Sequence, residues 1–211
     1  KLTILIVTYN RPKEVLKKIN FWKDYNFNVL IIDGSKKRLK LKKNYKNIKY
    51  FHKNEFQYYK RVFYIVKKAK TDYIKLESDD DYFSPEALTK SINFLDKDRS
   101  FSAVTGKCGI YSSFRKEVFI NSIFNNQKSL LQKDSYKRLK EYFSNYSPAL
   151  FYSVMRREVF ENNIKVLKKS IIYYGSEYEK FSEIHLPLSI CLSGKVKVID
   201  YLFWIRKDDD I

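Results

Sequence analysis

Cysteine is scarce in this sequence, and long apolar runs are absent. Only two cysteines occur among 211 residues, Cys108 and Cys191, and no metal-ligand spacing relates them. They are typical of buried thiols in a reducing compartment, with a single disulfide as the alternative. No apolar run approaches the roughly 20 residues that a membrane-spanning helix needs. We therefore expect neither a disulfide scaffold nor a spanning helix, and we expect a cytoplasmic protein.

Internal repeats, low-complexity tracts and long Pro/Gly/Ser linkers are also missing. A chain of this length with 44% hydrophobic residues is long enough to bury one core of ordinary size. We expect a single domain over residues 1–211, with two unequal lobes. Because the first residue is Lys1 and not methionine, we also expect the sequence to be part of a longer protein.

Acidic residues are outnumbered by basic ones, 24 against 42, which gives a formal net charge of +18. Such a surface suits nucleic acid, anionic phospholipid or an anionic small substrate, although the base composition of the gene could also produce it. The basic residues are spread along the chain except over 36–46 (KKRLKLKKNYK), which is either a solvated loop or helix, or a contact for membrane or phosphate.

Strand-like and helix-like segments alternate through the first half of the chain. This alternation predicts an α/β fold with a mostly parallel sheet covered by helices on both faces. The predicted strands are 2–7, 28–32, 48–51 and 73–76, and the predicted helices begin near Pro12, Phe56 and Pro85. In the second half we expect strands over 103–111, 149–155 and 195–199, and helices over 133–143 and 178–192.

Polar residues follow three of the predicted strands: Thr8 to Arg11, Asp33, and Asp79 to Asp81. Ligands of parallel sheets bind outside the carboxyl ends of the strands, so we expect these residues to share one crevice. Three consecutive carboxylates repel one another, and a divalent cation such as Mg²⁺ or Mn²⁺ would relieve that repulsion. The alternative is a solvated acidic turn in front of the helix that starts at Pro85.

The segments LTILIVTYNRPKEVLKKI, NVLIIDGS and TDYIKLESDDDYFSPEAL together resemble inverting, family 2-like glycosyltransferases of the GT-A type over residues 2–95. The resemblance implies a GT-A (Rossmann-like) three-layer sandwich with a central, mostly parallel sheet. It also implies a nucleotide-sugar-binding half over about 1–105 and an acceptor-binding half over about 106–211.

The resemblance implies roles for residues of the first half. Thr8, Tyr9 and Arg11 would border the base and diphosphate, Asp33 would contact the uracil or ribose, and Lys60 or Arg61 would face the nucleotide. Ser78 stands where the family's D-x-D element has its first Asp, which leaves the ligand pair open. We expect Asp79 to assist at the nucleotide, and Asp80 and Asp81 to bind Mn²⁺ or Mg²⁺; Asp79 with Asp81 is the other pair. Surface positions for Arg11, Lys60 and Arg61 are the alternatives.

The resemblance also places a catalytic carboxylate about a dozen residues before a glycine of the second half. Counting back from Gly194 reaches Glu183, which would be the general base, with Glu179 as the substitute. His185 and Arg206 are weaker candidates for an acceptor or phosphate contact. For His52, Tyr173, Tyr174 and Trp204 we favour structural roles, although the three aromatic residues could also stack on sugar rings.

The sequence therefore favours a metal-dependent glycosyltransferase that moves a sugar from a nucleoside diphosphate, UDP above all, to a saccharide or lipid-linked acceptor. The expected setting is surface polysaccharide or glycolipid assembly, with peripheral contact at the inner face of an anionic membrane. A nucleotidyltransferase is the first rival, but a glycine-rich phosphate loop is missing after the first strand. A basic nucleic-acid-binding module is the second rival; it would leave the Asp triplet unexplained, and we expect no nucleic acid partner. A catalytically silent glycosyltransferase is a third possibility because of Ser78.

Overall fold

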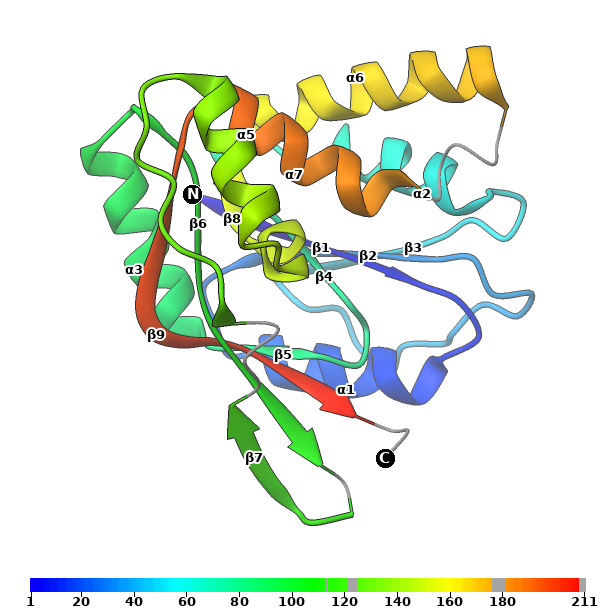
Figure 1. Ribbon diagram of the computed structural model, residues 1–211. Helices are drawn as coiled ribbons and strands as arrows, with labels where there is room; N and C mark the ends of the chain where they lie inside the picture. The colour runs from blue at the N-terminus through cyan, green and yellow to red at the C-terminus, as the bar shows by residue number, and fades with distance from the viewer. Residues whose placement is uncertain (113, 121–124, 176–180, 209–211) are drawn as a thin grey trace. The chain divides into compact units, whose positions relative to one another are not determined.

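The computed structural model describes residues 1–112, 114–120, 125–175 and 181–208. The chain forms two compact units, Lys1–Asp80 and Asp81–Ile211. Their elements are labelled in Figure 1. Within the described residues, no helix combines the length and the apolar character that a membrane crossing requires. The prediction of one domain with halves that meet near residue 105 stays a prediction.

The first unit contains a parallel sheet in the order β3-β2-β1-β4. Strand β1 (Leu2–Thr8) lies between β2 (Asn28–Asp33) and β4 (Tyr73–Glu77), and β3 (Ile48–His52) pairs with β2. The central strands are almost continuously buried, which explains why they read as apolar runs rather than as alternating patterns. All four strands were predicted from the sequence.

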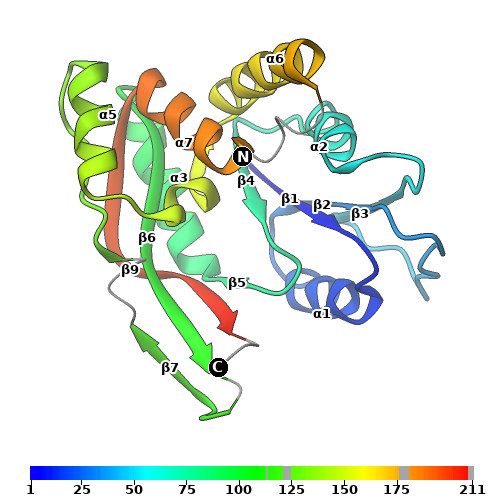
Figure 2. The same ribbon diagram turned by 45° about the vertical axis from the view of Figure 1, so that its right-hand side comes forward.

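Two helices cover opposite faces of this sheet, as Figure 2 shows. Helix α1 (Pro12–Trp22) begins with proline, which has no N–H to leave unsatisfied, and it buries Val15, Ile19 and Trp22. Helix α2 (Tyr58–Val66) buries Val62, Ile65 and Val66 on its apolar stripe. The first unit is therefore a three-layer α/β arrangement with its carboxyl strand ends at Thr8, Asp33 and Glu77.

The second unit is built around two long parallel strands, β6 (Phe101–Ser112) and β9 (Lys195–Asp208). Three shorter strands pair antiparallel with them: β7 (Glu117–Ile120) and β8 (Val154–Arg156) with β6, and β5 (Tyr82–Phe83) with β9. The predicted strand over 103–111 is confirmed, and the one over 195–199 is the beginning of a longer strand.

The helices that the structure describes in the second unit include α3 (Pro85–Lys97), α5 (Ser135–Ser144), α6 (Arg157–Tyr174) and α7 (Ser182–Ser193), with a short 3₁₀ helix η1 (Pro148–Tyr152). Helix α3 begins as predicted, because the Ser84 hydroxyl accepts a hydrogen bond from the Ala87 N–H at 3.3 Å. The strand predicted over 149–155 is wrong in its first part. Ser147 caps η1 there and Pro148 fixes its first residue, so only Val154–Arg156 is extended.

Candidate active site

The ends of β1 and β4 bring Thr8, Arg11, Asp79 and Asp80 together in the first unit. The Thr8 hydroxyl donates to Oδ2 of Asp79 at 2.6 Å, and Nη1 of Arg11 donates to Oδ1 of the same carboxylate at 2.9 Å. The same nitrogen also pairs with Oδ2 of Asp80. One guanidinium therefore joins two consecutive carboxylates, and these four of the residues that were expected to lie together are in contact.

The charges of this cluster shift one another's pKa values. Burial acts to raise the pKa of Asp80, but hydrogen bonds from Ser78 and Arg11 and the charge of Arg11 outweigh it, so that pKa is lowered. The hydrogen bond to Asp80 and the charges of both carboxylates raise the pKa of Arg11. Asp80 is thus held ionised in this cluster. Ser78, the departure from the family pattern, contributes a hydroxyl donor to it.

Asp33 ends β2 inside a hydrogen-bond network. Its Oδ1 accepts from the Ser35 backbone N–H at 2.8 Å and from the Ser35 hydroxyl, and its Oδ2 accepts from the Tyr50 hydroxyl at 2.6 Å. The Ser35 Oγ also accepts from the Asn10 N–H at 2.8 Å, and the Ser35 carbonyl lies 2.7 Å from Nε2 of His52. Burial is the main cause that raises the pKa of Tyr50 well above its ordinary value, and the hydrogen bond to Asp33 is the second. The hydroxyl therefore remains protonated and acts as a donor.

This network links the turn after β1 to the ends of β2 and β3. Asn10 has a φ of 57°, in the left-handed region that Asn tolerates better than most residues, and this conformation aims its N–H at Ser35. His52 takes the structural role that the sequence favours. Ser35 and Tyr50 were not singled out from the sequence. The Asp33-Gly34-Ser35 turn was a usable signal, because Asp side chains commonly accept from the N–H two residues on.

Arg61 of α2 is buried and reaches the end of β1. Its Nη1 donates to the Thr8 carbonyl, and its guanidinium lies 5.7 Å from the ring centre of Tyr9 and 6.0 Å from that of Tyr58. The solvated alternative is therefore wrong for Arg61, whereas its neighbour Lys60 is exposed. The exposed Tyr9 ring and the buried guanidinium thus lie close together at the end of β1.

A buried ion pair lies behind the acidic loop. Nζ of Lys18 is 2.6 Å from Oε1 of Glu77, both side chains are fully buried, and the Trp22 indole donates to the same oxygen at 3.0 Å. Glu77 directly precedes Ser78, so the pair anchors the start of the loop that carries Asp79 and Asp80. The sequence carried a partial signal for it, since Lys18 stands on the apolar stripe of α1 and Glu77 directly follows the strand predicted over 73–76.

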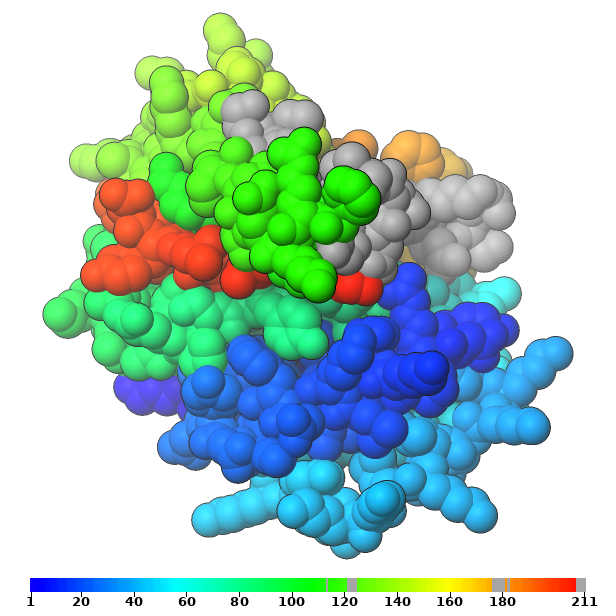
Figure 3. Space-filling model, turned by 90° about the horizontal axis from the view of Figure 1, so that it is seen from below, coloured from blue at the N-terminus to red at the C-terminus, as the bar shows by residue number. Residues whose placement is uncertain are grey.

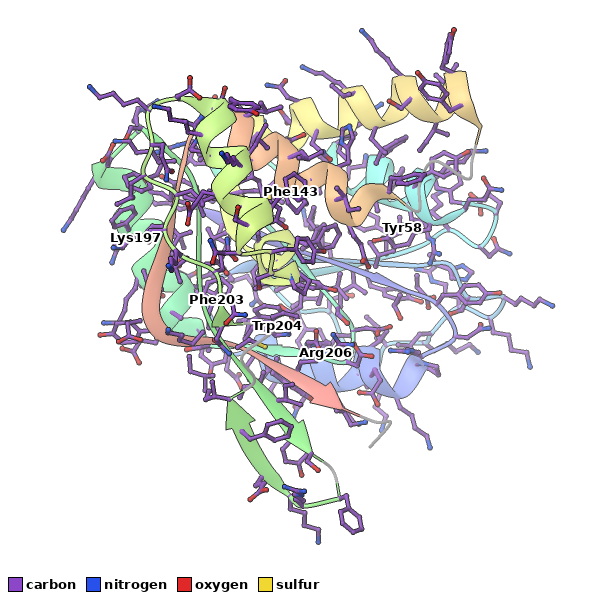
Figure 4. All side chains as sticks on the ribbon, in the orientation of Figure 1. Tyr58, Phe143, Lys197, Phe203, Trp204 and Arg206 are labelled. Atoms are coloured by element: carbon purple, nitrogen blue, oxygen red, sulfur yellow. The ribbon has the colours of Figure 1, made fainter. Side chains whose placement is uncertain are left out.

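Asp81 belongs to the second unit, since the boundary between the units falls after Asp80. Its Oδ1 accepts from the Lys207 N–H of β9 at 3.2 Å. Arg206, the preceding residue, is exposed, and Figure 4 shows it beyond Trp204 on the same strand. Trp204 itself is buried, and its ring stacks on that of Phe83 with 6.0 Å between the ring centres. This confirms the structural role favoured for it.

Glu183 and His185 stand in the first turns of α7. Glu183 is exposed. The pKa of Tyr146 is raised mainly by the burial of Tyr146 itself, and the negative charge of Glu183 adds to this effect. His185 is half-buried, with Nδ1 2.7 Å from the Asn163 side-chain nitrogen, and burial lowers its pKa. Glu179, the substitute base, lies outside the described residues.

Three further expectations have an outcome in the structure. The core role favoured for Tyr173 and Tyr174 is wrong, because 82% and 68% of their surfaces are exposed at the end of α6. Cys108 and Cys191 are both free and buried, which excludes the alternative of a disulfide. Burial raises the pKa of each thiol to about 12. The basic stretch over 36–46 is a loop without a helix.

The acidic residues provide oxygen donors of the kind that Mg²⁺ and Mn²⁺ take. Within the described ranges, no group of three or more His, Cys, Asp or Glu side chains is placed to hold a metal ion. The carboxylates of Asp79 and Asp80 do converge on a single cation, the guanidinium of Arg11. Of the two residues expected to bind the metal, Asp80 belongs to this cluster and Asp81 to the second unit. Two carboxylates suit a cation that keeps several waters and takes its remaining ligands from substrate phosphates.

Comparisons with known proteins identify the family and the fold. Residues 3–164 match the family model described as glycosyl transferase family 2, whereas no curated protein matches the chain. Among solved structures, the chain is similar to Staphylococcus aureus TarS 1–349, with a TM-score of 0.67, 16% identity and coverage of 98% of this chain and 60% of that one.

Two complexes of the same TarS fragment are also similar to the chain. The one with UDP-GlcNAc has a TM-score of 0.66 at 16% identity, covering 100% of this chain and 59% of that one. The one with UDP has a TM-score of 0.62 at 17% identity, covering 99% and 60%. The chain thus spans about 60% of the length of these structures. The likeness confirms the α/β GT-A fold, and the family match, which covers more than half of the chain, shows that it belongs to glycosyl transferase family 2.

Proposed function

We propose that this chain transfers a sugar from a nucleoside diphosphate donor, a UDP-sugar, to a hydroxyl acceptor with the help of Mn²⁺ or Mg²⁺. The observation that carries the proposal is the cluster of Thr8, Arg11, Asp79 and Asp80, which places a guanidinium and two carboxylates at one edge of a parallel sheet. The similar TarS structures with UDP-GlcNAc and UDP support the choice of donor.

Each end of the donor has a suitable partner. The network around Asp33 offers the buried carboxylate that would accept hydrogen bonds from the uracil or ribose, and the exposed Tyr9 ring offers a face for the base. Arg11 would bind the diphosphate, because its guanidinium pairs well with phosphate oxygens. Asp79 would assist there, and Asp80 and Asp81 would bind the metal. A bound divalent cation would stabilise the negative charge of the departing nucleoside diphosphate.

For the transfer itself we propose Glu183 as the general base. Its carboxylate would take the proton of the acceptor hydroxyl while that oxygen bonds to the anomeric carbon. The bond between this carbon and the phosphate oxygen would break at the same time, and the configuration would invert. His185 and Arg206 are proposed as weaker contacts for acceptor or phosphate. The exposure of Glu183 leaves it accessible to an acceptor.

We propose a saccharide or lipid-linked acceptor, as in surface polysaccharide or glycolipid assembly, and a cytoplasmic enzyme at the inner membrane face. The net charge of +18 supports contact with anionic lipid. Sedimentation with phosphatidylglycerol vesicles at low and high salt tests this setting. Absence of binding at both salt concentrations would exclude it.

The donor and metal are tested by calorimetric titration of UDP, GDP and CMP, with Mn²⁺ and then with EDTA. We expect UDP alone to bind tightly, only with Mn²⁺, and binding to be lost in Asp80→Ala and in Asp81→Ala. Asp24→Ala is the matched control, since its exposed carboxylate lies at the end of α1. No binding of any nucleotide under either condition would overturn the proposed function.

A further inference from the structure

A region rich in lysine and arginine lies beside the proposed donor site, and the proposed sugar transfer assigns no role to it. Residues 34–54 contain no Asp or Glu, whereas nine residues of this segment are Lys or Arg: 36, 37, 38, 40, 42, 43, 46, 49 and 53. These nine charges equal half of the net charge of +18. The segment comprises the loop after β2 and the strand β3, and its light-blue side chains extend at the lower edge of Figure 3.

Part of this segment lines a cavity of about 840 Å³ that is open to solvent. Arg38, Lys40, Lys43 and Lys49 line it, and among the residues that the structure describes no acidic side chain does. Between these cations, Tyr45 and Tyr50 contribute half-buried rings to the wall. The volume lies within the range of sites for small organic ligands, about 300–1,000 Å³, and is much larger than one phosphate group needs.

The four cationic side chains that line the cavity have no nearby carboxylate of the kind that neutralises several other lysines of this chain within its described residues. Lys17, Lys53 and Lys90 each lie within 4.0 Å of a carboxylate, those of Glu14, Glu55 and Glu86. In the part of the chain that the structure describes, none of the four cavity cations has an acidic partner at that distance. Like charges that converge on one cavity repel one another, and an anion with several charges would remove that repulsion.

Tyr50 connects the cavity to the proposed donor site. Its ring lines the cavity, its hydroxyl donates to Asp33 at 2.6 Å, and the same hydroxyl accepts from the Leu39 N–H at 3.2 Å. The bond to Leu39 holds the basic loop against β3, which gives the cavity a fixed wall. Because β3 pairs only with β2 within the first unit, its other edge is not covered by a strand of that unit.

We infer that the cavity lined by Arg38, Lys40, Lys43 and Lys49 is a second binding site, for a ligand that carries more than one phosphate group. Arg38 supplies the planar donor pattern that matches phosphate oxygens, and the lysines supply point charges around it. The half-buried rings suit an organic part of the ligand. This site does not depend on the proposed sugar transfer, because none of these four residues belongs to the cluster at Asp79 and Asp80.

Two variants with the same loss of charge test the inference. Lys40→Gln/Lys43→Gln removes two cavity cations, and Lys67→Gln/Lys70→Gln removes two exposed lysines of the same unit outside the cavity. Inorganic tripolyphosphate is titrated calorimetrically into the wild-type protein and both variants, and UDP with Mn²⁺ is titrated in parallel. We expect tripolyphosphate affinity to fall about tenfold or more in the cavity variant and less than about twofold in the control. The affinity for UDP stays unchanged in both.

A vesicle experiment on the same proteins identifies the source of the phosphate groups. Binding to vesicles that contain cardiolipin, whose headgroup has two phosphate groups, that is lost in the cavity variant alone assigns the site to lipid headgroups. Selective loss of tripolyphosphate binding alone assigns it to a soluble ligand. Equal losses in the two variants would show a general charge effect and overturn the inference, as would the absence of binding to both probes. Failure of UDP binding with tripolyphosphate binding intact would count against the donor site and not against this one.

Discussion

The guanidinium of Arg61 lies against Gly34 so closely that a Cβ on residue 34 would be 2.5 Å from its Nη1 and 2.7 Å from its Cζ. A side chain at position 34 would therefore force the end of the Arg61 side chain away from its place at the Thr8 carbonyl. We expect Gly34→Ala to displace the guanidinium and to lower the free energy of unfolding by about 1–3 kcal/mol. Urea denaturation measures it.

A double-mutant cycle isolates this contact. In an Arg61→Ala background the added methyl meets no guanidinium, so we expect Gly34→Ala to cost at least about 1 kcal/mol less there than in the wild type. If the two costs are equal, the clash with Arg61 is not the cause of the destabilisation.

The buried pair of Lys18 and Glu77 predicts a large stability effect. Lys18→Met removes one partner and leaves the Glu77 carboxylate without its counter-ion, so we expect a loss of about 3–5 kcal/mol in the free energy of unfolding. Adding Glu77→Gln should restore part of this loss, because the second variant carries no buried charge there. Denaturation followed by tryptophan fluorescence measures both.

Lys17→Met is the control for this experiment. Its ammonium pairs with Glu14 on the surface of the same helix, so its loss should cost less than about 1 kcal/mol. Equal effects at positions 17 and 18 would contradict the buried-pair explanation.

His185 predicts a pH dependence of stability. Burial lowers its pKa in the folded protein below the ordinary 6.5, and Nδ1 faces the Asn163 amide nitrogen, which is a donor. The unfolded chain therefore binds more protons below pH 6.5, so the contribution of His185 is present above that pH and is lost as the pH falls through the folded pKa. The partial exposure of the ring limits its size.

Two measurements check this. An NMR titration of the imidazole in a His52→Asn variant, which has a single histidine, should give a pKa below 6.5. The difference in unfolding free energy between that variant and one that also carries His185→Gln should shrink from pH 7.5 to pH 5. A titration midpoint at or above 6.5 would disprove the prediction.

Glu183→Gln tests the proposed base. We expect kcat for sugar transfer to fall about a hundredfold or more, with the affinity for UDP unchanged, since the amide cannot accept the proton. Glu158→Gln is the matched control, because this glutamate is also exposed in the first turn of a helix, α6. Equal activities in the two variants would remove Glu183 from the mechanism.

The parts that the sequence predicted well are set by local patterns. The first four strands are short apolar runs, and α1 and α3 carry proline at their first positions, so hydrophobic periodicity and turn chemistry suffice to find them. The association of Thr8, Arg11, Asp79 and Asp80 follows from the rule that ligands bind at carboxyl strand ends, once a parallel sheet is assumed.

The parts that it missed depend on contacts between distant residues. Helix α6 has 18 residues, but its buried stripe includes Asn163, which is stabilised by His185 and Ser189 of α7 and does not read as apolar. Burial of Arg61 depends on the space beside Gly34, and burial of Lys18 depends on Glu77, 59 residues away. Residue type alone places such cations at the surface, and only their partners reverse that expectation.

The hydroxyl of Ser35 forms hydrogen bonds with Asn10 and Asp33, and its carbonyl forms one with His52. One residue therefore joins the carboxyl ends of β1, β2 and β3. The base-binding end of the proposed site is thus held by hydrogen bonds within the protein, whereas the diphosphate end relies on Arg11, whose side chain is 51% exposed. A donor should therefore engage in two steps, with the nucleoside docking first at little entropic cost and the arginine reorienting afterwards. Transient kinetics with UDP should then show a fast phase that uridine shares and a slower phase that uridine lacks.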